Sequence, residues 1–460
     1  MNQNLNDISI AESIEFLRFS LEKKGLSSVY IRTYGCQLNL SDSEKIKGIL
    51  TLAGCSFCES ETDADIVVIN TCAVRLTAEE RVFGHLGRLK EYFTRNKDKL
   101  LMLGGCMVEQ EHIREHILKT YPFVGIIFST NNLSKLPELM IKRLEVSKNT
   151  LTSNPNEYLI DEDIPIVREQ TYRAFIPIMY GCDNYCTYCS VPYVRGNERS
   201  RNSNDIISEF NCVIENGYKE VMLLGQNVNS YGKNLEEKIN FSELLNDLCS
   251  NNEDYRIRFM TSHPKDATNE LFEVIASQSK ISRSIHLPVQ SGSNRILKEM
   301  NRNYTAERYM KLIEDARRII SGVTFTSDII IGFPNETEED YLDTLNLIKE
   351  VRFSSLFVFI YSPREGTKAA SLMDNIPHSE KVKRLTELTS IQNDISEEFN
   401  RKLLGVTQKA IATGVFDNYT EFRLDNNSIV RVEGAFTVGN FHNIVPNKII
   451  NRRLYGEAVS

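Results

Sequence analysis

The sequence predicts an α/β protein in three parts: an N-terminal parallel α/β domain, a central incomplete (β/α)6 barrel and a small C-terminal β-barrel. Short apolar runs alternate with helix-like stretches over the first part of the chain. Six further apolar runs begin at residue 173, and each turns polar, Gly-rich or Pro-rich at its end. After residue 405, alternating apolar runs are separated by Gly or Asn turns. A length of 460 residues suits about three domains.

The first predicted domain spans residues 28–145 and is preceded by an amphipathic stretch at Ile10–Leu21. Each of its apolar runs is followed by a helix-like segment, which is the pattern of a parallel sheet with crossover helices. The runs are VYIRTYG (29–35), DIVVIN (65–70) and LLMLGG (100–105). Residues 146–172 are polar and rich in turn formers, and we interpret them as a linker.

The second predicted domain spans residues 173–400 and holds the six apolar runs of the barrel. In a barrel of parallel strands the carboxyl ends converge on one mouth, where active sites lie. Six units, rather than eight, predict a barrel that is open on one side and admits a large substrate. The runs are AFIPIMYG, EVMLLGQN, RIRFMTSHP, SIHLPVQSG, FTSDIIIGFP and SLFVFIYSP.

A long helix is predicted before the last domain, residues 401–460, and is expected to end at Gly405. One face of it carries apolar residues every three or four positions, namely Val382, Leu385, Leu388, Ile391, Ile395, Phe399 and Leu403. The runs AIATGVF, SIVRVEG and FHNIVP then predict a small β-barrel.

From the sequence we expect a cytoplasmic protein. The longest apolar run, Leu356–Tyr361, is far shorter than the ~18 residues that span a bilayer. The N-terminus is polar and unlike a signal peptide, so the ten cysteines are expected as thiolates or metal ligands. The net charge of −8 argues against nonspecific nucleic-acid binding, but residues 401–460 hold eight Lys or Arg and five Asp or Glu, a net of +3.

One group of cysteines lies in MYGCDNYCTYC, at Cys182, Cys186 and Cys189. A closed zinc site would need four ligands, and the nearest other cysteines form no ligand-like pair. Three thiolates on a [4Fe–4S] cluster would leave one iron without a protein ligand and free to bind a substrate or cofactor. The alternative is a degenerate zinc knuckle.

A second group is Cys36, Cys72 and Cys106, each placed just past the end of a predicted strand. Parallel topology would bring them to one sheet edge, which again suggests a cluster with an open iron. The alternative is three unrelated buried thiols.

The other cysteines are not assigned to a site. Cys55 and Cys58 form CSFC but have no partner pair, and we interpret them as structural or incidental thiols. Cys212 and Cys249 lie in amphipathic helical stretches and are predicted to belong to the core.

These motifs together resemble the radical S-adenosylmethionine (SAM) methylthiotransferase family over roughly residues 29–405. The matching segments are TYGCQLNLSDSE, INTCAVR, GGCM, GCDNYCTYCSVPYVRGNERSR, LLGQNVNSYG, RFMTSHP, HLPVQSGSNRILKEMNR, DIIIGFPNETEED and FIYSPREGT. The resemblance implies two [4Fe–4S] clusters and two uses of SAM. It implies that Cys36, Cys72 and Cys106 hold a sulfur-donating cluster, and that Cys182, Cys186 and Cys189 hold the cluster that cleaves SAM.

The same resemblance implies SAM contacts at the ends of barrel strands, although each alone is also an ordinary strand-end turn. Gly225 and Gln226 would face the amino group, Gln290 and Ser291 the ribose, and Asp328 and Gly332 the adenine. No catalytic side chain beyond the cluster ligands is expected. Arg195, Arg199 and Arg201 are candidate phosphate or carboxylate contacts.

The segments GCQLN, LGQNVNSYG and VPYVRGNERSR look most like the branch that modifies C2 of N6-isopentenyladenosine beside the anticodon of tRNA. The alternatives are threonylcarbamoyladenosine in tRNA, an aspartate of a ribosomal protein, and, from another class, an iron–sulfur electron-transfer protein. The last domain resembles an RNA-binding TRAM domain but lacks its usual Gly-Arg-Thr stretch, and Ser190 and Asn197 also depart from the family pattern.

The partners implied are the anticodon stem-loop of tRNA, a reductase or flavodoxin-type electron donor, and iron–sulfur assembly proteins. We expect a monomer without membrane attachment.

Overall fold

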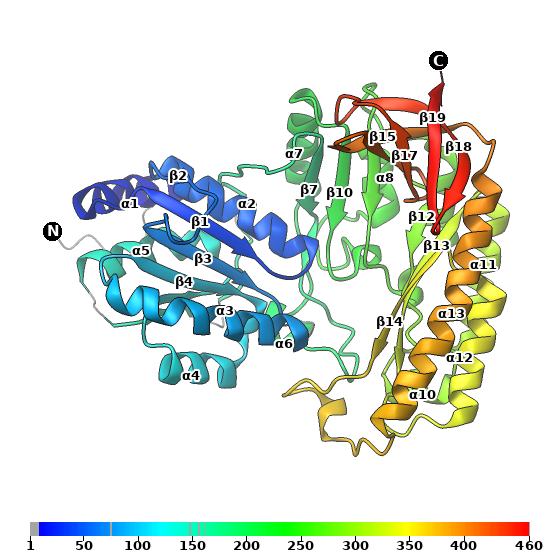
Figure 1. Ribbon diagram of the computed structural model, residues 1–460, viewed down its shortest axis with the longest axis horizontal. Coiled ribbons are helices and arrows are strands. Elements are labelled where there is room, and N and C mark those ends of the chain that lie inside the picture. The colour runs from blue at the N-terminus through cyan, green and yellow to red at the C-terminus, as the bar shows by residue number, and fades with distance from the viewer. Residues whose placement is uncertain (1–8, 74–75, 147–148, 155–156, 161, 460) are drawn as a thin grey trace. The chain divides into compact units, whose positions relative to one another are not determined.

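The computed structural model describes residues 9–73, 76–146, 149–154, 157–160 and 162–459 (Figure 1). The chain forms two compact units. The N-terminal unit comprises Met1–Glu169 and Ser190–Asn197, and the C-terminal unit comprises Gln170–Cys189 and Glu198–Ser460. Within the described ranges no helix combines the length and apolar character needed to cross a membrane. Parts of the predicted linker, at 147–148, 155–156 and 161, lie outside the described residues.

The N-terminal unit is built on one parallel sheet with the strand order β2-β1-β3-β4-β5-β6. The three predicted runs form its central strands β1, β3 and β4, which confirms the expected parallel α/β fold. The short edge strands and β5, whose run contains a glycine, were not predicted from the sequence. The strands are β1 (Ser28–Thr33), β2 (Ser56–Phe57), β3 (Ile66–Thr71), β4 (Leu100–Gly105), β5 (Val124–Phe128) and β6 (Leu151–Thr152).

Helices cover both faces of this sheet (Figure 1). In β3, Ile66 and Val68 pack with one set of helices, whereas Val67 and Ile69 pack with the other. Both faces are therefore buried, as in doubly wound folds. The helices α1 (Ile10–Lys24), α2 (Gln37–Leu52) and α5 (Leu136–Glu145) cover one face, and α3 (Leu76–Arg95) and α4 (Glu111–Thr120) cover the other.

The C-terminal unit contains the predicted six-stranded series as two parallel sheets, β7-β10-β11 and β12-β13-β14. A parallel bridge between Ile257 and Ile281 links the two halves. Among the described residues β7 and β14 are not paired with each other, so the barrel is incomplete, as predicted. The strands are β7 (Arg173–Pro177), β10 (Glu220–Leu224), β11 (Arg256–Phe259), β12 (Ser284–His286), β13 (Thr324–Ile331) and β14 (Ser355–Ile360).

Helices follow these strands and cover the outside of the barrel. They are α7 (Ser203–Glu215), α8 (Phe241–Leu248), α9 (Asn269–Ser277), α10 (Asn294–Glu299), α11 (Ala306–Ile319), α12 (Glu338–Val351) and the predicted long helix α13 (His378–Leu403). A short antiparallel pair, β8 (Met179–Tyr180) and β9 (Arg199–Ser200), flanks the cysteine loop.

The last strand of the barrel presents two different faces. Leu356, Val358 and Ile360 of β14 pack against the core beneath the helices, so the alternate residues point into the barrel. Those residues include Phe357 and Phe359, which are 46% and 37% exposed. The inner face of β14 is therefore aromatic and open.

The chain ends in a closed barrel with the strand order β15-β16-β17-β19-β18, as the sequence predicts. The predicted runs are β15, β17 and β18. The strands β16 and β19 were not predicted from the sequence. The bounds are β15 (Gln408–Phe416), β16 (Tyr419–Leu424), β17 (Ile429–Glu433), β18 (Phe441–Ile450) and β19 (Arg453–Val459).

A buried charge cluster joins this small barrel to the larger one. Glu220 is fully buried and pairs with Arg173 and with Arg258, whose Nε lies 2.6 Å from the carboxylate. Arg258 also donates to the carbonyls of Leu424 at 2.8 Å and Asp425 at 2.9 Å, in the turn after β16. The guanidinium of Arg258 is thus one of the groups that join the two barrels.

Candidate functional site

The structure brings Cys36, Cys72 and Cys106 together at the carboxyl edge of the N-terminal sheet. Cys36 precedes α2, Cys72 follows β3, and Cys106 opens a short 3₁₀ helix, η2 (Cys106–Glu109), after β4. The strands before them, β1, β3 and β4, are neighbours in the sheet. Their loops therefore lie side by side, as parallel topology requires.

Asn39 lies at the centre of this group. Its Oδ1 is 3.8 Å from the sulfur of Cys36 and 3.8 Å from the sulfur of Cys106. Its Nδ2 donates to the carbonyls of Tyr34 at 2.9 Å and Thr71 at 2.7 Å. One amide side chain therefore ties together the loops that carry the cysteines.

Two glycines allow the loops to approach this closely. Gly35 has φ +120°, and a Cβ there would lie 2.5 Å from the Cβ of Cys72. Gly105 has φ +100°, and a Cβ there would lie 2.2 Å from the carbonyl oxygen of Thr71. A side chain at either position would push apart the backbone segments that carry the thiols.

The donor set determines which metal group fits here. Burial raises the pKa of the Cys106 thiol to about 12, and the Arg195 guanidinium opposes that rise. No group of three or more His, Cys, Asp or Glu side chains in the described part of the chain could hold a single metal ion. A four-iron cluster is larger and takes thiolates at separate corners, so three converging cysteines suit it, with one iron left open.

Cys182, Cys186 and Cys189 lie in the C-terminal unit, on the loop after β8. The backbone N–H of Cys189 donates to the carbonyl of Cys186 at 3.0 Å, which folds the loop into a turn. Asn184 Nδ2 donates to the sulfur of Cys182 at 3.3 Å. Three thiols on one short turn can reach separate corners of one cluster.

Arg302, which was not predicted as a site residue, is a buried arginine beside this loop. Its Nη1 lies 3.6 Å from the sulfur of Cys186, and its Nη2 donates to the carbonyl of Pro288 at 2.6 Å. The residue lies within the matched segment HLPVQSGSNRILKEMNR. No local pattern pointed to Arg302, because its contact with Cys186 joins positions 116 residues apart in the sequence.

Orphaned polar atoms gather at the carboxyl ends of β10 and β11. Within the described part of the chain, Gln226 Oε1, Ser262 Oγ and His263 Nε2 are buried and have no hydrogen-bond partner. Burial, together with the charge of Arg302, lowers the pKa of His263, so its imidazole is neutral. Buried polar atoms normally find partners, so this mouth of the barrel fits a polar ligand such as SAM. Gly225 and Gln226, predicted to contact SAM, lie at this mouth.

The predicted residues Gln290 and Ser291 follow β12. Gln290 has φ +70° and forms a parallel bridge with Ile329 of β13. Ser291 is fully buried, and its hydroxyl lies 3.3 Å from that of Thr344. Their roles as ribose contacts remain predictions.

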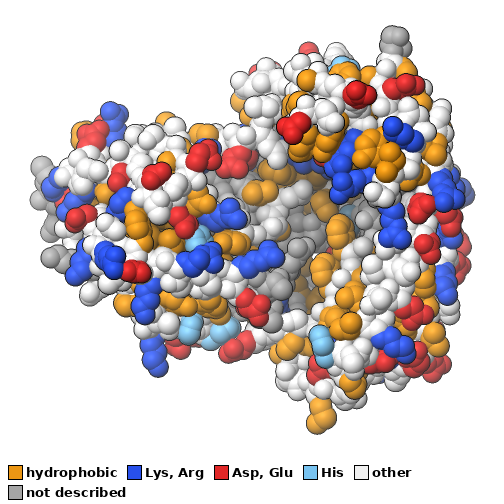
Figure 2. All heavy atoms as spheres, in the orientation of Figure 1, with side chains coloured by type: hydrophobic (Ala, Val, Ile, Leu, Met, Phe, Trp, Pro, Cys, Tyr) orange, Lys and Arg blue, Asp and Glu red, His pale blue; other side chains and the backbone are white. Residues whose placement is uncertain are grey.

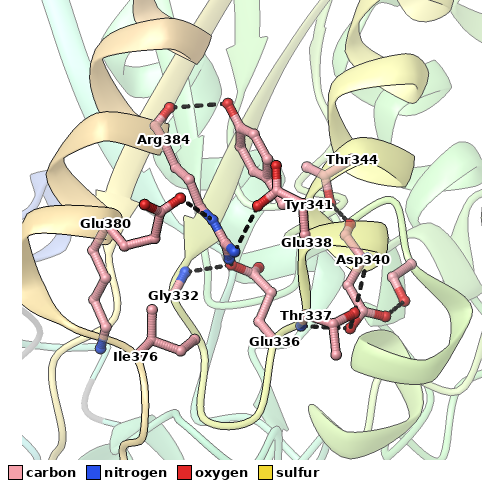
Figure 3. Close-up of polar contacts among 12 residues, drawn as sticks. Gly332, Glu336, Thr337, Glu338, Asp340, Tyr341, Thr344, Ile376, Glu380 and Arg384 are labelled. Carbon is pink, nitrogen blue, oxygen red and sulfur yellow. Dashed lines mark hydrogen bonds and ion pairs between the residues drawn. The ribbon is translucent and has the colours of Figure 1, made fainter.

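Asp328 and Gly332, predicted to line the adenine, belong to β13 and the turn after it. An oxygen of Asp328 lies 3.5 Å from His286 Nε2. The N–H of Gly332 donates to Glu336 at 2.8 Å, and Arg384 pairs with the same carboxylate at 2.8 Å (Figure 3). Because that N–H is already bonded, Gly332 would shape a ligand site rather than donate to it.

Of the three arginines expected to contact phosphate or carboxylate, Arg195 and Arg201 are buried and Arg199 is half-buried. Arg195 is 2% exposed and pairs with Asp42, and Arg201 is 6% exposed and pairs with Glu209, in both cases at 2.7 Å. Their carboxylate partners are thus side chains of the protein itself.

The remaining cysteines are apart from both groups. Cys55 is buried in the core, with its pKa raised to about 11 by burial, and the Cys58 thiol donates to backbone carbonyls. Cys249 is buried, as predicted. Cys212 is exposed, so its predicted place in the core is wrong: α7 buries Ile206, Phe210, Val213 and Ile214 instead.

Comparisons with known proteins show which families and proteins this chain is similar to. Residues 176–348 match the radical SAM superfamily, and residues 28–129 match the uncharacterized protein family UPF0004. The tRNA-2-methylthio-N(6)-dimethylallyladenosine synthase of Carboxydothermus hydrogenoformans is 47% identical over 84% of this chain and 88% of its own. The enzyme of that name from Clostridium tetani is 43% identical over 95% of this chain and 98% of its own.

Among solved structures, the radical S-adenosylmethionine methyltransferase TsrM of Kitasatospora setae superposes with a TM-score of 0.54. The match covers 75% of this chain and 77% of that one at 12% identity, which supports the fold alone.

Proposed function

Because this chain belongs to the family of tRNA-2-methylthio-N(6)-dimethylallyladenosine synthases, within the radical SAM superfamily, we propose that it methylthiolates C2 of N6-isopentenyladenosine next to the anticodon of tRNA. Its 47% identity to a synthase of that name, over most of both chains, is the observation that carries the proposal. The radical SAM match and the polar barrel mouth also argue against a protein that only carries electrons.

The proposal assigns different tasks to the two groups of cysteines. Cys182, Cys186 and Cys189 hold the cluster that binds SAM, and Cys36, Cys72 and Cys106 hold a second cluster. With SAM bound, the first cluster would supply the electron that releases a 5′-deoxyadenosyl radical from SAM, and the second cluster would supply a methylated sulfur. The protein positions them, and the orphaned atoms of Gln226 and His263 are available to SAM.

The inner face of β13 and β14 is suited to the substrate base. Phe357 and Phe359 are exposed there, beside Asp328 and Ile330, their partners in the sheet register. Hydrophobic side chains gather over β14 in Figure 2. An aromatic face stacks on a purine and accepts an apolar isopentenyl group, whereas a threonylcarbamoyl group would bring a buried carboxylate.

The C-terminal barrel offers a surface for the rest of the tRNA. Phe416 and Tyr419 stack with ring centroids 5.0 Å apart, and the guanidinium of Arg431 lies 4.6 Å from the ring of Tyr419. Phe416 is exposed, whereas Tyr419 and Arg431 are half-buried and Arg431 also pairs with Glu421 at 3.0 Å. Aromatic and cationic groups are typical of contacts with single-stranded RNA. The setting proposed is cytoplasmic, with a reductase or flavodoxin-type donor and iron–sulfur assembly proteins as further partners of a monomer.

The test is mass spectrometry of tRNA nucleosides from a strain that lacks the protein. We expect loss of 2-methylthio-isopentenyladenosine and accumulation of isopentenyladenosine. The wild type and Cys212→Ala, which changes an exposed cysteine outside both groups, should restore the nucleoside. Cys186→Ala should not. If only the threonylcarbamoyladenosine product were lost, or no tRNA nucleoside changed, the proposed substrate would be wrong.

A further inference from the structure

A short segment just after Cys189 belongs to the N-terminal unit, although the residues on both sides of it belong to the C-terminal unit. The segment is Ser190–Asn197 and contains α6 (Val191–Arg195). The helix α6 packs on η2, the turn that carries Cys106. Val194 forms a small buried apolar group with Ala73 and Cys106, and its carbonyl accepts from Asn131 Nδ2 at 2.9 Å. The segment thus covers one of the N-terminal thiols.

Arg195, at the end of α6, contacts the sulfur of Cys106 directly. Its Nε donates to that sulfur at 2.9 Å. Its Nη2 donates to Asp42 Oδ2 at 2.7 Å and to Asn39 Oδ1 at 3.0 Å. Arg195 and Asp42 are both 2% exposed, so these contacts are made away from water.

The Arg195 guanidinium makes two separate contacts: an ion pair with Asp42 and a hydrogen bond to the sulfur of Cys106. A buried charge is costly unless it is paired, and Asp42 supplies the opposite charge. An ion pair alone would leave Nε free to point elsewhere, but here it faces a cysteine sulfur. The same Asn39 oxygen that accepts from Arg195 lies between the sulfurs of Cys36 and Cys106. Arg195 therefore contacts the Cys106 sulfur directly, and the Asn39 side chain connects it to the Cys36 sulfur.

We propose that Arg195 is a positioning residue for the cluster held by Cys36, Cys72 and Cys106, and that with Asp42 it sets the reduction potential of that cluster. The inference rests on the proposed function, which places a cluster there. Hydrogen bonds to the sulfurs and nearby net charge are among the factors that set such potentials. The donor Nε–H and the positive charge favour the reduced, more negative cluster, and the Asp42 carboxylate opposes it.

The segment also links the two cysteine groups along the chain. Arg195 follows Cys189 by six positions, so the loop that carries the second group continues into the side chain that contacts the first. Sequence spacing alone identified Arg195 only as a candidate anion contact.

The experiment uses the full chain with Cys182, Cys186 and Cys189 changed to Ala, so that only the N-terminal cluster remains. Iron is counted after reconstitution, and the reduction potential is measured by EPR-monitored titration. Arg195→Gln should lower the potential, because a charge and a donor are lost. Asp42→Asn should raise it, because the opposing carboxylate is lost. We expect about tenfold in the one-electron equilibrium for each, equivalent to about 59 mV.

Arg168→Gln is the matched control. Arg168 also belongs to the N-terminal unit, and its side chain is 8% exposed. It lies 3.7 Å from Glu44, which is on α2 like Asp42. Its loss should reduce stability and leave the potential unchanged.

Opposite shifts from Arg195→Gln and Asp42→Asn, with no shift in the control, would support the inference, since a loosened fold would move all three alike. Unchanged potentials, or shifts in one direction only, would overturn it while leaving the proposed function intact. If Arg195→Gln does not fold, Asp42→Asn and Arg195→Lys decide the matter. Absence of iron in the parent variant would overturn the two-cluster proposal and this inference together.

Discussion

Replacing Gly105 by Ala should remove the N-terminal cluster without touching any ligand. Gly105 pairs with Thr71 in the ladder between β3 and β4, directly before Cys106 and Cys72. An added Cβ would lie 2.2 Å from the Thr71 oxygen, whereas real Cβ atoms stay at least 3.0 Å away, so the strands must separate by about 0.8 Å. At φ +100° an Ala also adds backbone strain of about 1–3 kcal/mol.

The variant is assayed by counting iron per chain after reconstitution and by chemical unfolding. We expect the iron content to fall to about half, from roughly eight atoms to four, because the other cysteine group is unaffected. Gly84→Ala is the control: it lies in α3, with nothing within 4 Å of an added Cβ. That change should stabilise the helix by about 0.5–1 kcal/mol and preserve the iron. Full iron content and stability in Gly105→Ala would refute the close approach of the two strands.

Three further changes have distinct expected outcomes. Glu220→Gln leaves the buried cations Arg173 and Arg258 without their carboxylate and should cost about 3–5 kcal/mol in chemical unfolding; unchanged stability would contradict that pairing. Burial raises the pKa of Glu109 from 4.5 to about 7, so the folded protein favours the protonated carboxyl. The stability that this carboxyl contributes is fully present below pH 4.5 and is lost as the pH rises through 7. Glu109→Gln should therefore gain up to about 3 kcal/mol over the wild type between those pH values, and a pH-independent difference would rule this out. Phe357→Ala should lower kcat/KM for isopentenyladenosine tRNA by about 5- to 100-fold if its ring stacks on the base, and an unchanged value would exclude it from the site.

Much of the fold follows from the sequence because periodicity and strand-end chemistry are local signals. The buried runs of β3 and β4 and the cysteines just beyond them were predicted in this way. The strand β16 was not predicted, although its apolar residues Phe422 and Leu424 alternate with charged residues as those of the predicted strand β17 do.

The parts of the site that escaped the sequence depend on long-range contacts. Arg195 contacts Asp42 across 153 positions, and no local pattern marks that pair. Cys212 was wrongly predicted to be buried. The amphipathic pattern of its helix does not show whether a small residue near the edge of the apolar face is buried or exposed. The inner face of β14 was not recognised because Phe357 and Phe359 form part of a continuous apolar run. Only the packing of their neighbours against the helices shows which way the rings point.

The proposal that one cysteine group serves SAM cleavage and the other sulfur donation is tested most directly in vitro. The assay contains reconstituted protein, SAM, a reductant and an anticodon stem-loop bearing isopentenyladenosine. The variant lacking Cys36, Cys72 and Cys106 should still release 5′-deoxyadenosine but add no methylthio group. The variant lacking Cys182, Cys186 and Cys189 should release none. Methylthiolated RNA from the first variant, or 5′-deoxyadenosine from the second, would contradict the assignment.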